Sequence, residues 1–131
     1  MPLVSPTRIV REILLQAPAV VAIVGARIGT EVADRNDPRP HLVLNLIGSA
    51  EEENLAEVAD MDRATVACQC WGDTFDAAET LALAVKGALR SYRGTIQGHS
   101  VSIRHSGEAA DFIPAAEAYR RVIVWEVTIS A

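Results

Sequence analysis

The pattern of hydrophobic and polar positions changes most clearly within residues 63–90. From 65 to 71, apolar side chains occur on both sides of an alternating pattern, which predicts a strand whose two faces are both partly covered. Gly72, Asp73 and Thr74 interrupt this period, and Asp73 or Thr74 is suited to cap a helix. The apolar stripe of that helix is Ala77, Ala78, Leu81, Ala82, Val85, Ala88 and Leu89. The stretch therefore predicts a strand, a tight turn and the longest helix of the chain.

Leu83 falls on the polar side of this helix, together with Asp76, Glu79, Lys86 and Arg90. A single exposed leucine is common on protein surfaces and needs no special explanation. An apolar residue on the solvent side is also what a contact between subunits would use. The sequence leaves both interpretations open, and Leu83 is a candidate for a subunit contact.

Two shorter helices are predicted near the N-terminus. Ser5 followed by Pro6 is typical of a helix start, with serine as the cap and proline in the first turn. Its buried stripe is expected to be Ile9, Val10, Ile13 and Leu14. Pro18 begins a second short helix, and Gly25 stands at the usual C-terminal position.

Further strands are predicted at about 28–32, at 41–49, near Ile96, at 100–105 and at 119–130. The last of these is the longest, and Ile123, Trp125, Val127 and Ile129 are expected to face the core. Its length favours a central position or pairing across a subunit boundary. The segments at about 49–62 and 106–118 are expected to be long loops, and the first is too long for a hairpin turn.

The order of these elements predicts one α+β domain over residues 1–131. Adjacent strands joined by loops favour a mostly antiparallel sheet of four to five strands with helices packed on one face. The chain is long enough for a core without disulfides, and that core must be aliphatic because aromatic residues are few.

The composition indicates in which cellular compartment the protein is expected to reside. No apolar run approaches the roughly 20 residues that span a bilayer, and the N-terminus lacks the order of a secretory signal. Cys68 and Cys70 are one residue apart and make no disulfide framework. Cytoplasmic residence with no membrane partner is the resulting expectation.

The net charge of −5 is concentrated in residues 51–62, which hold six acids and no base. The rest of the chain is nearly neutral, so an ordinary basic nucleic-acid binder is excluded. Glu51, Glu52 and Glu53 begin this acidic run. It is either a solvated loop or a loop that meets a partner or lines a pore.

Reactive chemistry finds little support in the motifs. The candidate metal ligands are Cys68, Cys70, His41, His99 and His105. The two cysteines are spaced too closely for a usual structural zinc pair, and two cysteines on one side of a strand favour core packing. No nucleophile elbow, Walker loop or dinucleotide fingerprint occurs in the sequence, so catalytic and cofactor-binding residues are not expected.

Four stretches together resemble the phage tail completion, or tail terminator, family of long-tailed phages and gene transfer agents. The first runs from Gln16 to Ile28 around Pro18 and Gly25, and the second is the proline-led strand start at 38–44. The third is the strand, Trp71, turn and alanine-rich helix of 66–89. The fourth is Tyr119-Arg120-Arg121 at the start of the last strand. The acidic run at 51–53 is heavier than the family pattern.

The resemblance implies a structural virion protein with an α+β fold, no catalytic residues and no cofactor. Such proteins form a homohexameric ring on the head-proximal end of the finished tail tube. The implied partners are copies of the chain, the tail tube protein and the head-side connector, with DNA only as passing cargo. Assembly in the bacterial cytoplasm is implied, and Glu51, Glu52 and Glu53 become candidates for the rim or lining of a channel.

Two other functions remain open at this level. The chain could be a different neck or head–tail joining protein, which a twelve-fold ring would favour. It could also be a small cytosolic α+β enzyme or ligand-binding domain. A deep pocket with convergent polar groups would favour that class.

Overall fold

A computed structural model describes residues 5–30, 39–52, 61–115 and 117–130. Within these ranges the chain forms three helices and one six-stranded sheet with the order β1-β2-β3-β6-β5-β4. The helices are α1 (Pro6–Leu15), α2 (Pro18–Val24) and α3 (Phe75–Leu89). The strands are β1 (Ile28–Thr30), β2 (His41–Glu52), β3 (Met61–Gly72), β4 (Arg93–Ile96), β5 (His99–Ile113) and β6 (Ala118–Ser130).

The sheet is built on the central pair of β3 and β6, which run antiparallel over their whole length from Met61 opposite Ser130 to Gly72 opposite Tyr119. β2 lies antiparallel beside β3, and β5 lies antiparallel beside β6. β1 is the one parallel neighbour in the described sheet, and it pairs with β2. The final strand, β6, therefore lies in the centre of the sheet, which confirms one of the two positions that its length favours.

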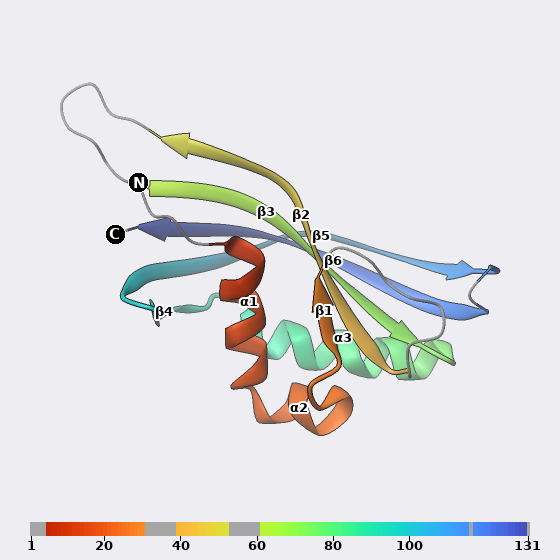
Figure 1. Ribbon diagram of the computed structural model, residues 1–131. Helices are drawn as coiled ribbons and strands as arrows, with labels where there is room; N and C mark the ends of the chain where they lie inside the picture. The colour runs from red at the N-terminus through yellow and green to blue at the C-terminus, as the bar shows by residue number, and fades with distance from the viewer. Residues whose placement is uncertain (1–4, 31–38, 53–60, 116, 131) are drawn as a thin grey trace.

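All three helices lie on one side of the sheet, as Figure 1 shows, and this confirms the expected layering. The alternating strands supply the other half of the core. The fully buried strand residues on this side include Leu42, Leu44, Val66, Cys68, Cys70, Ile123, Trp125, Val127 and Ile129. The helices close over them with the predicted stripes, so the large core is aliphatic apart from Trp125.

The helix ends follow their local sequence. The Ser5 hydroxyl accepts the backbone N–H of Arg8 at 3.4 Å, and Pro6 occupies the first turn of α1. Thr74, one of the two candidates, caps α3 by accepting the N–H of Ala77 at 3.1 Å. Gly25 ends α2 with a φ of 59°, a value that favours glycine.

Two sequence expectations were wrong in detail. The sheet has six strands rather than four to five, because both short edge strands, β1 and β4, are present. The loop expected at 106–118 is mostly strand, since β5 continues to Ile113 opposite β6. The residues of this stretch are mostly polar or small and mostly exposed, so the sequence shows no apolar alternation there. The backbone hydrogen bonds to β6 nevertheless continue.

The loop expected at 49–62 is also shorter than predicted. β2 extends to Glu52, β3 begins at Met61, and these two residues face each other across the ladder. β2 and β3 are therefore antiparallel neighbours up to this pair of residues. Only 53–60 of the acidic run lie outside the described residues.

Candidate assembly surface

The face of the sheet that carries no helix is only partly buried, apart from a small buried cluster of Val43, Trp71 and Ala118 at one end. Most of its side chains on β3 and β6 are half-buried, including those of Thr65, Gln69, Val122, Val124 and Thr128, while Ala67 is buried. The Trp71 indole N–H donates to Oε1 of the Gln69 side chain at 3.2 Å, and the Gln69 side-chain amide donates to Oδ1 of Asn45. The polar groups of this face are thus joined to one another across β2 and β3.

Arg120 anchors the same face near the β5–β6 turn. Its guanidinium lies 5.6 Å from the centre of the Trp71 ring and forms two hydrogen bonds to Asp111, at 3.0 and 2.6 Å. The hydrogen bonds from Arg120 lower the pKa of the Asp111 carboxyl and raise the pKa of Arg120 itself. The paired charges hold β5 against β6 on the uncovered side.

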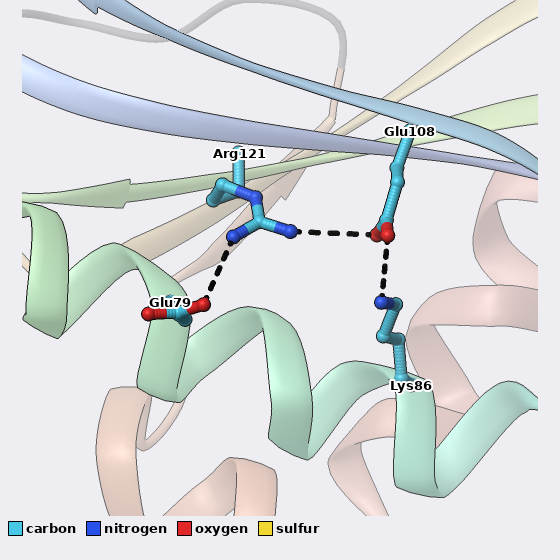
Figure 2. A network of polar contacts seen from close by, with 4 residues as sticks. All are labelled: Glu79, Lys86, Glu108 and Arg121. Atoms are coloured by element: carbon cyan, nitrogen blue, oxygen red, sulfur yellow. Dashed lines mark hydrogen bonds and ion pairs between the residues drawn. The ribbon is translucent and has the colours of Figure 1, made fainter.

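A second charged network lies on the helix side, and Figure 2 shows its four residues. Lys86 on α3 contacts Glu108 at 2.8 Å, and Arg121 lies between Glu108 at 3.6 Å and Glu79 at 3.4 Å. The hydrogen bond from Lys86 is the main reason that the pKa of Glu108 is lowered, and the charge of Arg121 adds to it. The network ties α3 to β5 and β6 beyond the apolar core.

An exposed aromatic cluster lies where α3 begins and the β5–β6 hairpin turns. Phe75 meets Tyr119 edge-on, with ring centres 6.3 Å apart, and Phe112 lies 5.0 Å from Tyr119. Phe75 is 46% exposed and Phe112 is 48% exposed. Exposed rings held together in this way are typical of protein–protein contacts.

Among the residues that the structure describes, each of the two outer long strands has a neighbouring strand along only part of its outer side. β1 pairs with Leu42–Leu44 of β2, and β4 pairs with residues 99–102 of β5. We call residues 45–52 the β2 edge and residues 104–113 the β5 edge. Among the described strands, none lies along the outer side of either edge. Leu46 and Ile47 on the β2 edge are 41% and 59% exposed.

The residues singled out from the sequence fall in different places. Leu83 projects from the outer side of α3 and is 61% exposed, which agrees with its predicted position. The backbones of Glu51 and Glu52 form the end of β2, opposite Asp62 and Met61. Glu53 lies outside the described residues. Leu83 lies on α3, whereas Glu51 and Glu52 lie on β2, so these candidate residues belong to different elements.

The described residues offer little reaction chemistry. No group of three or more His, Cys, Asp or Glu side chains in these ranges could hold a metal ion. Burial raises the pKa of the Cys68 thiol to about 12, against a small opposing effect of Trp125. Burial also raises the pKa of Cys70, so neither thiol is reactive at neutral pH. None of the described helices has the length and apolar character needed to cross a bilayer.

Two open grooves carry polar walls. A groove of about 390 Å³ is lined by Arg63, Arg93, Arg104, Ser91, Ser102, Ile103, Glu126 and Thr128. Another of about 670 Å³ lies between α1 and β1 and includes Arg11 and Glu12. Arg104 is paired with Glu126 at 3.0 Å. No Cys or His is among the described residues that line either groove.

Sequence reasoning missed the aromatic cluster and the two uncovered edges. Phe75, Phe112 and Tyr119 are far apart in sequence, so no local pattern joins them. The edges depend on strand order, which the hydrophobic pattern does not contain. The exposed pair Leu46 and Ile47 lies at the bulge between Leu46 and Gly48, which no sequence pattern announces because Leu42, Val43 and Leu44 are also consecutive and pair regularly.

Comparison with known proteins gives a family and a fold. The model of the family described as tail completion protein gp17 matches residues 8–130. A solved chain described as "Virion of native gene transfer agent (GTA) particle" is similar, with a TM-score of 0.70, 15% identity, and coverage of 97% of this chain and 96% of that chain. A second solved chain has a TM-score of 0.58 at 13% identity, covering 95% and 94%. At such identities the solved structures establish the fold alone. No curated protein matches the sequence.

Proposed function

The chain belongs to the tail completion protein gp17 family and is a structural component of a phage-type tail, and from this premise we propose that it forms a ring that caps the finished tail tube. The ring ends tube polymerisation and joins the tail to the head-side connector. The observation that carries the proposal is the extent of the family match, since residues 8–130 include almost the whole fold. The similar fold in a gene transfer agent virion supports the same role.

The surface of the fold is consistent with assembly. A ring is built from heterologous contacts that close by rotation, so each copy must present two different patches. The uncovered sheet edges, the aromatic cluster and Leu83 supply more than one exposed apolar patch on a single chain. The partners are copies of this chain, as a homohexamer, the tail tube protein on one side and the connector on the other.

The proposal places the protein at the head-proximal end of the tail, after assembly in the bacterial cytoplasm. It catalyses no reaction there and needs no cofactor. DNA passes through the ring as cargo. Leu83 is one candidate for the contact between copies, because it is a large aliphatic side chain on the solvent side of a rigid helix.

The test is assembly of particles without the protein. Tails should then be of irregular length or fail to join heads, and added protein should restore both properties. Native mass spectrometry of the purified protein, or imaging of tail ends, should give a six-fold ring. Normal tails joined to heads in the absence of the protein would overturn the proposal. A twelve-fold ring would point to a neck protein instead.

The acidic run suggests a property of the ring channel. We propose that Glu51, Glu52 and Glu53 line or rim the channel, where like charge would repel DNA phosphates and keep the path from binding its cargo. Replacing all three with Gln should slow or impair DNA delivery without changing ring size. Asp76→Asn, an exposed acid at the start of α3, is the control. Delivery at the wild-type level by the triple variant would contradict this role.

A further inference from the structure

Arginine side chains gather on the face of the sheet without helices, close to β4. Two rows of residues cross the strands there. The first row contains, in strand order, Arg63, Thr128, Ser102 and Arg93. The second row, two residues away on each strand, contains Thr65, Glu126 and Arg104. Val127 and Ile103 alternate with these residues and are buried against the helices, so both rows face the other way.

These rows line the open groove of about 390 Å³, which we call the arginine groove. Its described lining holds three arginines against one glutamate, so it is a positive site on a chain whose net charge is −5. Ser102 and Thr128 are half-buried between the strands that carry Arg63 and Arg93, and each supplies a hydroxyl group. The groove therefore combines guanidinium groups from three strands with hydroxyl donors.

Arg93 and Arg104 are accessible to a ligand. Both side chains are exposed. The ion pairs found among the described residues do not include Arg93. Arg104 pairs with Glu126 at 3.0 Å, but the Arg104 side chain is 79% exposed. An ion pair this exposed is weak because water screens both charges, so Arg104 can turn toward another anion.

We propose that the arginine groove binds phosphate groups of the DNA backbone. The inference rests on the proposed function for the identity of its ligand, because DNA is the polyanion that passes through a tail. Guanidinium groups bind phosphate oxygens through paired N–H donors, and hydroxyl groups add further donors. Among the described residues that line the groove, none is aromatic, so no platform is offered for base stacking. The contact is therefore made to the backbone and is independent of base sequence.

The spread of the donors favours a chain of phosphates over a single carboxylate. Neighbouring strands lie about 4.8 Å apart, so three strand steps separate the backbones of Arg63 and Arg93 by about 14 Å. A single carboxylate is satisfied by one guanidinium, as Glu126 is by Arg104. A polyanion with repeated phosphates can instead engage both ends of the row at once.

The contact with DNA is local and weak. The acidic run ends at Asp62 and Arg63 follows it directly, so negative and positive stretches adjoin at the start of β3. With its net charge of −5 the protein as a whole repels DNA, and only the groove attracts it. The combination lets DNA touch the ring without being retained, which is consistent with DNA as passing cargo.

DNA binding by the purified full-length protein tests this assignment. A short labelled duplex, followed by fluorescence anisotropy, should bind at low salt, and the logarithm of its affinity should fall linearly with the logarithm of the salt concentration. Arg93→Gln should weaken binding about tenfold and reduce the salt slope by about one, because one phosphate contact is lost. Arg8→Gln is the matched control, since it removes an exposed arginine from α1 on the helix side and should change neither quantity.

A pair of variants with opposite effects separates binding from stability. Arg104→Gln removes the cation of one ion pair, and Glu126→Gln removes its anion. Arg104→Gln should weaken DNA binding and Glu126→Gln should strengthen it, each by about three- to tenfold at low salt. If the ion pair serves only to stabilise the sheet, both variants should lower the melting temperature alike and leave DNA binding unchanged. That result would overturn the inference.

Other outcomes of the binding assay also count against the groove. Equal effects of Arg8→Gln and Arg93→Gln would show that DNA responds to charge anywhere on the surface. Displacement of the duplex by inorganic phosphate at an equal concentration of phosphate groups would assign the groove to a free anion. Absence of duplex binding at low salt would remove DNA as its ligand. Each of these results overturns the inference and leaves the proposed function standing.

Particles assembled with a variant that carries both Arg93→Gln and Arg104→Gln separate the inference from the proposed function. Tails of normal length joined to heads are expected, because the groove is a contact with DNA and not with another protein. Failure of this variant to enter tails, with the circular dichroism spectrum and melting temperature of wild type, would place carboxylates of a neighbouring protein in the groove and overturn the inference. Normal tails joined to heads in the complete absence of the protein would instead overturn the proposed function.

Discussion

The two faces of the sheet are made by the same strands, but a single chain buries one of them far more fully than the other. On the helix side Val66, Cys68 and Trp125 are fully buried. On the other side Thr65 and Val124, their neighbours in sequence, remain partly exposed. Strand alternation alone does not produce this difference; the three helices do, because all of them pack on one face. A single chain therefore leaves much of its second face partly exposed.

The largest expected loss of stability comes from a cavity in the core between the sheet and the helices. Trp125→Ala removes a fully buried indole between the sheet and the helices. Replacements of this kind cost about 3–5 kcal/mol of unfolding free energy because a cavity remains. Val124→Ala, on the opposite face, should cost about 1 kcal/mol or less, as partly exposed positions usually do. Urea titration followed by circular dichroism measures both.

The pair also tests whether the second face is packed less tightly than the helix side. In the isolated chain the two losses should differ by at least twofold. Equal losses would mean that the uncovered face is packed as tightly as the core, which would contradict the comparison.

A second contrast uses two glycines. Gly72 lies under the start of α3, where an added Cβ would come within 2.5 Å of the backbone nitrogen of Ala78. Gly72→Ala should therefore cost about 1–3 kcal/mol, the usual penalty for overpacking. Gly87, on the exposed side of α3, has open space around such a Cβ. Gly87→Ala should stabilise the protein by about 0.5–1 kcal/mol, because alanine favours the helix.

Melting temperatures of the two variants give a simple readout, since they should move in opposite directions from wild type. A stable Gly72→Ala protein would mean that the strand and α3 can separate at little cost. The covered face would then be less rigid than its packing implies.

The sequence predicted the covered face far better than the uncovered one, for a physical reason. Val66, Leu81 and Trp125 recur at strand or helix periods because burial selects apolar residues at those positions. The strand from Ser106 to Ile113 was missed because backbone pairing with β6 holds it, and backbone pairing leaves no apolar period. The uncovered edges depend on strand order and on the short strands β1 and β4. Of the predicted site residues, Leu83 was placed correctly on the outside, while its contact stays a prediction.

The smallest expected effect is the pH dependence of stability that comes from one ion pair on each face of the sheet. Glu108 binds Lys86 on the helix side and Asp111 binds Arg120 on the other, and in both cases the partner lowers the carboxyl pKa below its ordinary value of 4.5 or 3.8. A carboxyl whose folded pKa is depressed stabilises the fold above its unfolded pKa, and this contribution is lost as the pH falls through the folded pKa. Stability should be flat from pH 7 to about 5 and should decline below about 4.5.

Glu108→Gln and Asp111→Asn should each make the acid decline shallower, and Glu117→Gln, an exposed residue of the β5–β6 turn, is the control. Both effects should be modest because these carboxylates are partly exposed and water screens them. Melting temperatures at pH 7 and at pH 3.5 measure the slope for each variant. An unchanged slope in both acid variants would show that other carboxylates control acid unfolding. A change in Glu108→Gln alone would place the acid-sensitive contact on the helix side.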